Sequence, residues 1–304
     1  MRPNPWTIRE LLKVTTDYLQ KKNIDSPRLT AEILLAHCLN INRIDLYLDL
    51  DRPLNEKEVS AYRDVIRRRI SREPLEYITG TQEFWSLEFL VSDKVLIPRP
   101  ETEILVEQAL DLCNRSSFKD SPRILDLGTG SGAVAVSLAK EIPYARIWAT
   151  DISQEAIDLA GLNAQRHGVV DRIDFGQGDL LQPFVGRGIS FDIIVSNPPY
   201  VASEEYEGLA PEVRDHEPRI ALDGREGGLY YIEEIIETSP SFLLPAGWLL
   251  LEMAPGQTEK ALELIGAIKA FGEKARIKDY SRRYRVVKAQ KVDSLEAARV
   301  EEPS

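Results

Sequence analysis

The chain has 304 residues, of which 43% are hydrophobic and 29% are charged, and its formal net charge is −11. This length allows about two domains, each with an apolar core of its own. No apolar run reaches the roughly 20 residues that a membrane-spanning helix needs, and residues 1–6 lack the apolar stretch of a signal peptide. We therefore expect a cytoplasmic protein.

The charge is unevenly distributed along the chain. Residues 1–75 hold 14 Lys and Arg against 11 Asp and Glu, a net of +3, so the remainder carries −14. Nucleic acids are bound through clustered Lys and Arg, so an acidic body argues against a partner that is held mainly by its phosphates. The basic cluster Arg67-Arg68-Arg69 favours a solvated helix face, and contact with RNA or with an acidic partner is the other interpretation.

Residues 1–73 predict a small all-helical domain. Ser26 before Pro27 is a start signal for one helix. Two capping-box pairs open further helices: Thr7 with Glu10, and Asn55 with Glu58. Apolar residues recur at helical spacing after each of these signals.

A linker at residues 74–98 follows, and its aromatic stretch at 82–91 predicts a β-hairpin. A helix at 104–113 then precedes regular alternation. Strands are expected at 123–127, 145–150, 172–176, 191–196 and 248–251, helices at 133–140, 154–167, 229–238 and 257–270, and an antiparallel strand pair at 275–280 and 284–289. This order predicts an α/β domain at 99–290, with a mainly parallel sheet covered on both faces. The charged residues 291–304 predict a disordered tail.

A glycine-rich turn follows the first strand of the α/β domain. Its residues are Gly128, Thr129, Gly130, Ser131 and Gly132. Such a turn lies beyond the carboxyl ends of the strands, where open α/β sheets bind ligands. Its glycines let a ligand approach the backbone closely, and the helix start is expected to offer free N–H groups.

Carboxylates near this turn indicate a nucleoside ligand. Asp126 lies two residues before the first glycine, and Asp151 ends the next strand, where a carboxylate can accept both hydroxyls of a ribose. Both NAD and S-adenosylmethionine present such a ribose. Asp179 follows the third strand, and we expect it beside the adenine.

The fourth strand ends in Asn197-Pro198-Pro199-Tyr200, which suits methylation of an amide or amino nitrogen. Such a nitrogen is a poor nucleophile and gains positive charge as it attacks. The side-chain oxygen of Asn197 and the backbone carbonyl of Pro198 can accept its two N–H bonds, which orients the nitrogen and stabilises the charge. The prolines pre-organise these acceptors, and Tyr200 offers a flat face to a planar group. No nucleophilic triad and no metal cluster is apparent, so we expect no metal.

These motifs resemble the release factor glutamine methyltransferase family, also called PrmC or HemK, over nearly the whole chain. The similarity covers Tyr77 to Gly80 with Glu83 to Trp85, Leu96 to Glu103, Asp126 to Gly132 and Ser196 to Val201. Further along it includes Glu217-Pro218, Ala221-Leu222 with Gly224, and Gly227-Gly228-Leu229, although the stretch at 222–228 departs mildly from the family pattern. The resemblance implies a seven-stranded, Rossmann-like class I methyltransferase domain behind a helical domain that recognises the substrate. It implies transfer of a methyl group from S-adenosylmethionine to N5 of the glutamine in the Gly-Gly-Gln motif of peptide chain release factors.

The resemblance also assigns roles to single residues. Those that would contact the cofactor are Gly128, Thr129, Gly130, Ser131, Gly132, Asp151, Asp179, Leu180 and Asn197. Leu180 stands where the family often has an aromatic residue. Those that would hold the glutamine or wall its pocket are Asn197, Pro198, Pro199, Tyr200, Phe84, Arg99 and Glu101, and the catalytic ones would be Asn197, Pro198 and Tyr200.

Other functions remain open at this point. A glutamine methyltransferase of a ribosomal protein would share the fold, the cofactor and the chemistry. An amino-methyltransferase of DNA or RNA also uses Asn-Pro-Pro-Tyr, and it would show a basic groove around Asn197. A nucleotide-binding module without activity and a dehydrogenase are further alternatives, and the intact motifs argue against both.

Overall fold

The computed structural model describes residues 5–115 and 121–292. Residues 1–4 and, from residue 293 on, the predicted tail lie outside this range. By their contacts, the described residues form two units. The first comprises the residues up to Thr81 and the segment Ala210–His216, and the second comprises Gln82–Leu209 and the residues from Glu217 on. None of the helices in the described ranges combines the length and the apolarity that crossing a bilayer requires.

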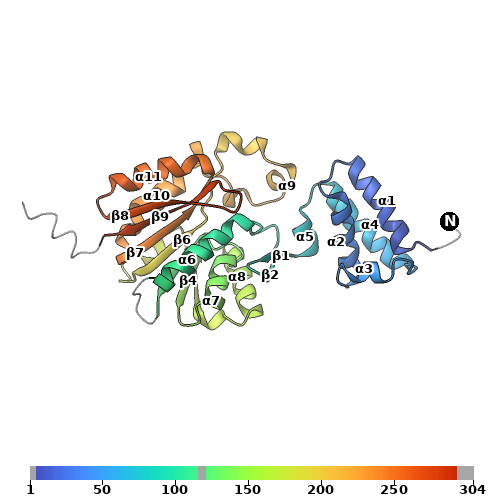
Figure 1. Ribbon diagram of the computed structural model, residues 1–304, viewed down its shortest axis with the longest axis horizontal. Coiled ribbons are helices and arrows are strands. Elements are labelled where there is room, and N and C mark those ends of the chain that lie inside the picture. The colour runs from blue at the N-terminus through green and yellow to red at the C-terminus, as the bar shows by residue number, and fades with distance from the viewer. Residues whose placement is uncertain (1–4, 116–120, 293–304) are drawn as a thin grey trace, which may run out of the picture. The chain divides into compact units, whose positions relative to one another are not determined.

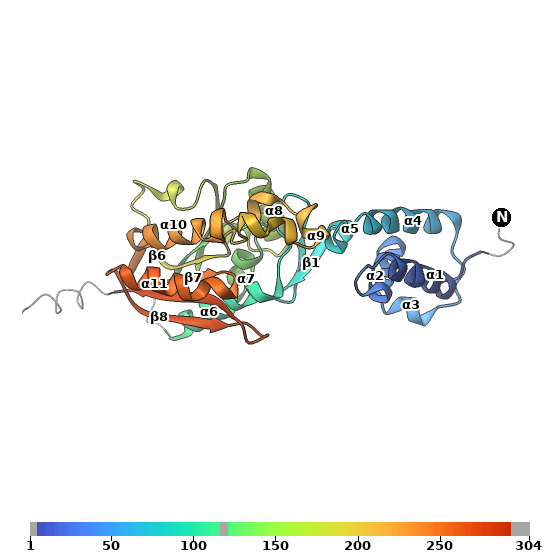
Figure 2. The same cartoon turned by 90° about the horizontal axis from the view of Figure 1, so that it is seen from above.

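The first unit is helical, as its sequence predicts (Figure 2). Its helices are α1 (Ile8–Lys21), α2 (Pro27–Leu39), α3 (Asp45–Leu48), α4 (Glu56–Ile70), α5 (Leu75–Thr79) and α9 (Pro211–Arg214). Both expected capping boxes are present, at Thr7 for α1 and at Asn55 for α4. Ser26 also marks the start of α2, but it lies in the left-handed region at φ 45° and makes no side-chain cap bond, so its predicted capping role is wrong.

The basic cluster of α4 is paired within this unit. Arg67 contacts Asp64 at 2.9 Å, and Arg68 pairs with Glu73. Arg69 contacts Glu212 of the segment Ala210–His216 at 3.0 Å. The side chain of Arg69 is only 8% exposed, so the expectation of a wholly solvated helix face is wrong for this residue. Guanidinium groups that are paired with carboxylates in this way have less attraction for phosphates.

The second unit is built on a seven-stranded sheet of order β5-β4-β3-β6-β7-β9-β8, in which β9 runs antiparallel to the other strands (Figure 1). Its strands are β3 (Arg123–Leu127), β4 (Arg146–Asp151), β5 (Ile173–Gln177), β6 (Phe191–Ser196), β7 (Leu243–Glu252), β8 (Phe271–Lys278) and β9 (Tyr284–Lys291). The predicted alternation, the parallel sheet and the antiparallel pair at its end are therefore confirmed.

Helices cover both faces of this sheet (Figure 1). They are α6 (Glu103–Arg115), α7 (Ala133–Glu141), α8 (Gln154–Arg166), α10 (Tyr230–Thr238) and α11 (Thr258–Ala267). Successive strand residues enter different cores, since Ile193 and Val195 pack with α6 and α7, whereas Ile194 packs with α10 and α11. This explains why the strands read as continuous apolar runs, as expected when a parallel sheet is buried on both faces.

The sheet changes direction beside β3. The chain adds β4 and β5 on one side of β3, and it then returns to place β6 on the other side. Ligands bind at such a switch point, outside the carboxyl ends of the strands. The glycine turn after β3 and the Asn197 motif after β6 therefore start from neighbouring strand ends.

A short hairpin precedes the sheet, as predicted, with β1 at Thr81–Phe84 and β2 at Leu87–Leu90. Its two turn residues, Trp85 and Ser86, have φ values of 52° and 56°. Left-handed conformations at both turn positions match the right-handed twist of the strands. The Trp85 N–H groups donate to Glu103 and Glu141, which helps to hold this uncommon backbone.

Candidate active site

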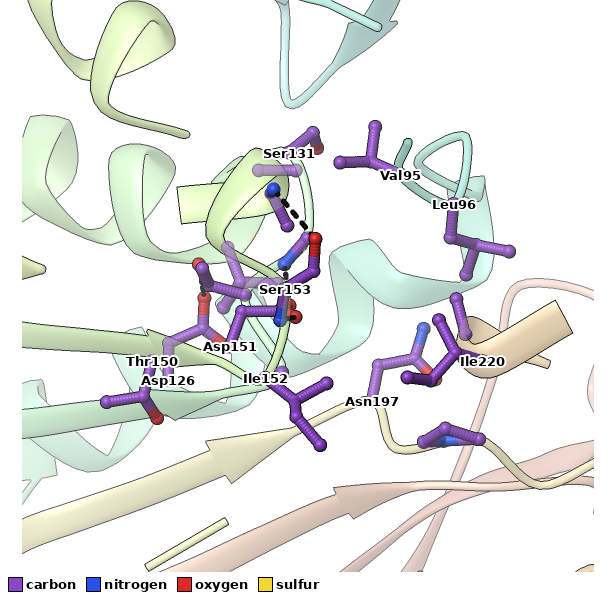
Figure 3. A pocket seen from close by; sticks show the side chains of 18 of the residues that line it. Val95, Leu96, Asp126, Ser131, Thr150, Asp151, Ile152, Ser153, Asn197 and Ile220 are labelled. Carbon is purple, nitrogen blue, oxygen red and sulfur yellow. Dashed lines mark hydrogen bonds between the residues drawn. The ribbon is translucent and has the colours of Figure 1, made fainter. Parts of the chain in front are cut away.

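A cavity lies at the carboxyl edge of the sheet in the second unit. It is lined by residues that follow β3, β4, β5 and β6 and by the segment at 94–102. Figure 3 shows Asp126, Thr150 and Asp151 on one side of the cavity and Asn197 with Ile220 on the other. The predicted site residues that line it are Gly128, Thr129, Gly130, Ser131, Asp151, Asp179, Leu180, Asn197, Pro199 and Arg99.

The glycine turn uses most of its N–H groups internally. Those of Gly128 and Thr129 donate to Thr150 O at 2.8 and 2.9 Å, that of Gly130 to Asp151 Oδ2 at 2.9 Å, and that of Gly132 to Thr129 O at 2.8 Å. The expectation of free N–H groups concerns the helix start, and it is wrong for Gly132, the N-cap of α7, and for Ala135, whose N–H donates to Asp126 Oδ2 at 3.2 Å. A pyrophosphate needs such donors, so the turn suits a ligand that has no phosphate at this point.

Asp126 adds negative charge under the turn. It is 2% exposed, and its Oδ2 accepts hydrogen bonds from Thr129 Oγ1 at 2.7 Å and from the Ala135 N–H at 3.2 Å. Burial raises the pKa of Asp126 to about 7, against these hydrogen bonds, which lower it. A carboxylate at this position repels phosphate and favours a cation.

Asp151 is placed to bind hydroxyl groups at the end of β4. Its Oδ1 accepts from the Ser153 N–H at 3.0 Å and its Oδ2 from the Gly130 N–H at 2.9 Å. Burial raises the pKa of Asp151, and these backbone N–H groups lower it. Hydrogen bonding by the backbone of Ile152 also lowers this pKa. Because a carboxylate has four lone-pair directions, Asp151 keeps acceptor capacity for a ligand hydroxyl.

The loop after β5 supplies the next wall of the cavity. Gly178, Asp179 and Leu180 all line it. Only glycine fits at the first position, because a Cβ there would lie 2.2 Å from Pro183. Leu180 has a φ of 44°, and its side chain packs against the apolar core under α10 and α11 while it also borders the cavity. It thus offers an aliphatic surface where Asp179 offers a polar one.

Asn197 borders the cavity at the end of β6 (Figure 3). Its Nδ2 donates to Thr102 Oγ1 at 3.1 Å, which leaves Oδ1 as a free acceptor function of the carboxamide. Pro199 also lines the cavity, whereas Pro198 and Tyr200 are not among its lining residues. Burial raises the pKa of Tyr200 to about 12, so this phenol stays protonated over the physiological range.

The segment before α6 is anchored by a buried carboxylate. Glu217, which is 5% exposed, accepts from the Ile97 N–H at 3.3 Å and forms an ion pair with Arg99. This holds Arg99 at the cavity, while Glu101 is not among the lining residues. Phe84 is 1% exposed and packs edge-on against Phe89 in the core, so the structure gives it a packing role rather than the pocket wall that we expected.

The sequence does not predict the hydrogen bonds by which Gln257 holds the backbone behind Tyr200, which we call the Gln257 brace. Gln257 Nε2 donates to Tyr200 O at 2.9 Å and to Gly228 O at 3.1 Å. Two glycines leave the room that this arrangement needs, since a Cβ on Gly224 would lie 2.7 Å from Pro199 O and one on Gly228 would lie 2.2 Å from Tyr200 O. The glycine-rich stretch at 224–228 was the available signal, but nothing in the sequence says what it packs against.

Comparisons with known proteins match the chain in both halves. Residues 10–80 match the family model "PrmC N-terminal domain", and residues 102–212 match "Methyltransferase small domain". A release factor glutamine methyltransferase of Geobacter sulfurreducens is 44% identical over 261 residues, which are 86% of this chain and 89% of that protein. One of Chlorobaculum tepidum is 42% identical over 281 residues, which are 91% of this chain and 95% of that protein.

Solved structures support the fold. The catalytic domain of hMettl16, crystallised with an RNA hairpin of the MAT2A 3′UTR, has a TM-score of 0.56 with this chain at 16% sequence identity. The match covers 73% of this chain and 81% of that one. This likeness concerns the arrangement of the sheet and its helices.

Proposed function

The chain belongs to the release factor glutamine methyltransferase family, and we propose from this membership that it transfers a methyl group from S-adenosylmethionine to N5 of a release factor glutamine. The observation that carries the proposal is the sequence identity over both halves of the chain, together with Asn197 at a cavity that suits a nucleoside without phosphate. The target is the glutamine of the Gly-Gly-Gln motif, and the product is N5-methylglutamine.

The residues at the cavity fit S-adenosylmethionine better than a dinucleotide. Asp151 has acceptor capacity for the two ribose hydroxyls. Asp126 provides negative charge for a ligand that carries an ammonium and a sulfonium group, and the inward-turned N–H groups of the glycine turn offer little to a pyrophosphate. Asp179 and the apolar Leu180 suit the polar edge and the face of the adenine. The remaining turn residues, Ser131 and Gly132, complete the proposed cofactor set.

The chemistry assigned to the chain's own residues is positioning. S-adenosylmethionine supplies an electrophilic methyl group. Asn197 Oδ1 and the Pro198 carbonyl accept the two N–H bonds of the target amide, which orients the nitrogen and stabilises the positive charge that it gains. Pro199 and Tyr200 fix this backbone, and Arg99 belongs to the wall on the substrate side. Glu101, which does not line the cavity, stays a predicted substrate contact. The extra proton leaves to water, since the cationic amide that still bears both N–H bonds after methylation is strongly acidic, and no general base is required.

A protein substrate is also favoured over nucleic acid by charge. The residues after 75 carry a net −14, and the arginines at 67–69 are paired with carboxylates. We propose the helical residues 1–73 as the part that recognises the substrate, the residues at 74–98 as a linker, and 99–290 as the methyltransferase domain. Because release factors act on ribosomes, we also propose that the enzyme works in the cytoplasm.

A methylation assay tests this function directly. Purified enzyme, labelled S-adenosylmethionine and a bacterial release factor should give label on the one glutamine of the Gly-Gly-Gln motif, mapped by mass spectrometry. Replacing that glutamine by glutamate should abolish labelling, since the carboxylate has no N–H to orient and no amide nitrogen to methylate. If parallel reactions with purified ribosomal proteins or with RNA are labelled and the reaction with the release factor is not, the proposal is overturned in favour of the corresponding alternative.

The affinity for S-adenosylmethionine should depend on pH through Asp126, whose pKa burial raises to about 7. A bound cation favours the ionised carboxylate, so binding near neutral pH should release a proton, and the affinity at pH 6 should be about tenfold below that at pH 8. Titration calorimetry in two buffers of different protonation enthalpy measures both effects. Asp126→Asn should remove the pH dependence, while Asp158→Asn, an exposed position, should keep it. Equal affinities at both pH values in the parent enzyme would contradict the role of Asp126.

A further inference from the structure

Glu252 is a buried carboxylate behind the Asn197 motif that the chemistry above does not use. It ends β7 and is 1% exposed. Strand β7 runs parallel to β6 with Leu251 opposite Ser196, so Glu252 follows in register beside Asn197. Its Oε2 has no hydrogen-bond partner. A buried carboxylate oxygen without a partner destabilises a fold, which makes a purely structural role a poor explanation.

Thr102 connects this carboxylate to the carboxamide of Asn197. Its side chain is buried and accepts a hydrogen bond from Asn197 Nδ2 at 3.1 Å, and hydrogen bonding by Thr102 lowers the pKa of Glu252. Thr102 also lines the cavity. The three side chains therefore form a chain of hydrogen bonds that runs from the buried end of β7 to the proposed acceptor of the target amide.

The direction of the hydrogen bonds among Glu252, Thr102 and Asn197 depends on the charge of Glu252. A hydroxyl has one hydrogen to donate, whereas an ionised carboxylate can only accept. Thr102 must then donate to Glu252 and present a lone pair to Asn197. Only the NH2 group of Asn197 can meet that lone pair, so Oδ1 is turned to the other side. A carboxamide alone has no such preference, because its two ends have nearly the same shape.

We propose that Glu252 is a positioning residue, which through Thr102 fixes the carboxamide of Asn197 so that Oδ1 faces the target amide. This inference rests on the proposed function, since Oδ1 matters only if an N–H group is its partner. When Glu252 is protonated or replaced by glutamine, Thr102 can instead donate to Asn197 Oδ1. The carboxamide then turns over and presents two donors to a substrate nitrogen that also has only donors to offer.

The surroundings of Glu252 place this switch near neutral pH. Burial raises the pKa of Glu252 to about 7, while Thr102, Arg285 and Arg99 lower it and Glu101 raises it further. Tyr200 also faces the carboxylate, and its own pKa of about 12 keeps it neutral in this range. Because the ionised form is the one that orients Asn197, kcat should rise with pH through about 7 and level off above it.

The first test is kinetic and uses saturating S-adenosylmethionine and release factor. Glu252→Gln should lower kcat at pH 8 by about 10- to 100-fold, the scale of a misoriented acceptor, and it should flatten the pH profile. The KM for the release factor and the Kd for S-adenosylmethionine should stay within about threefold of the parent values. Thr102→Val should give the same pattern. Glu263→Gln, at an exposed position of α11 in the same unit, is the control and should keep kcat and the pH profile.

The second test needs no turnover, so it separates this inference from the proposed function. The side-chain NH2 signals of Asn197, assigned by their loss in Asn197→Asp, should shift with pH in 15N-resolved NMR with a midpoint near 7. Glu252→Gln should remove this titration. The inference is overturned if Glu252→Gln keeps kcat within threefold of the parent value, if kcat and cofactor affinity fall together, or if the Asn197 signals do not titrate. Failure of the parent enzyme to methylate release factors would sink the proposed function alone.

Discussion

Asn197→Ala should lower kcat by at least about 100-fold, the usual loss when one oriented acceptor or donor is removed from a reaction site. Asn197 lines the cavity, and its carboxamide donates only to Thr102, so Oδ1 is available to the target amide. The substituted enzyme keeps the glycine turn and Asp151. Asn197 is only one of the residues that would contact the cofactor, so we expect the Kd for S-adenosylmethionine to change by less than about fivefold, while most of the loss concerns the transition state.

The measurement is single-turnover transfer of labelled methyl to a release factor, combined with titration calorimetry for the cofactor. Asn114→Ala, on the exposed side of α6 in the same unit, is the matched control and should behave like the parent enzyme. A rate for Asn197→Ala within threefold of the parent would show that the carboxamide does not act on the substrate. An equal loss of rate and of cofactor affinity would indicate a structural role at the cavity.

Gly228→Ala should be the most damaging of the glycine substitutions in the second unit. Gly228 has a φ of 70°, and a Cβ there would lie 2.2 Å from Tyr200 O, 2.6 Å from Gln257 Nε2 and 3.0 Å from Ala202 N. The backbone of the Asn197 motif must move to make room. A displacement of about 1 Å at a reacting group costs on the order of 100-fold in rate, and the combined strain should lower the free energy of unfolding by about 3–5 kcal/mol.

Two neighbouring glycines separate the causes of this effect. Gly227 has a φ of 64°, and a Cβ there would have no atom within 4 Å. Gly227→Ala should therefore lower the free energy of unfolding only by the cost of a left-handed alanine, about 1–2 kcal/mol. Gly256 has neither the positive φ nor a close neighbour, so Gly256→Ala should be nearly neutral. Urea unfolding and kcat, measured for all three variants, should rank Gly228 far above Gly227 and Gly256. Similar unfolding free energies and kcat values for Gly228→Ala and Gly227→Ala would contradict the inference that Gly228 leaves the room needed by the backbone at Tyr200.

The parallel sheet could be predicted because its signals are local. Strands β3, β4, β6 and β7 contain short apolar runs, and helices of suitable length lie between the parallel strands. Strand β7 shows where this fails. In the structure β7 begins at Leu243, whereas the sequence predicts a start at residue 248. Ala246 adopts a φ of 61°, and the pairing with β6 shifts between Phe191 and Ile193, so a bulge separates the first residues of β7 from the apolar run. A bulge of this kind depends on the neighbouring strand, which local sequence does not reveal.

The candidate site was predicted in part for the same reason. Asp151 and Asn197 stand at strand ends, so the topology alone brings them to one edge of the sheet. Phe84 is different, since an aromatic residue near a site motif can face either the cavity or the core, and only packing decides. The sequence does not predict a role for Glu252, because this residue simply ends an apolar strand. Its link to Asn197 passes through Thr102, which lies about 150 residues earlier in the chain.

The place of Ala210–His216 in the helical unit has a consequence for any attempt to divide this protein. Glu212 forms ion pairs with Arg69 and Arg72 at 3.0 and 3.2 Å, and all three belong to the first unit. A fragment that begins at Gln82 would retain this glutamate and lose both guanidinium groups, and a fragment that stops at Thr81 would leave the buried Arg69 without its carboxylate. No single cut in the chain yields two intact halves, so complementation by separately expressed pieces would have to restore these pairs from two molecules.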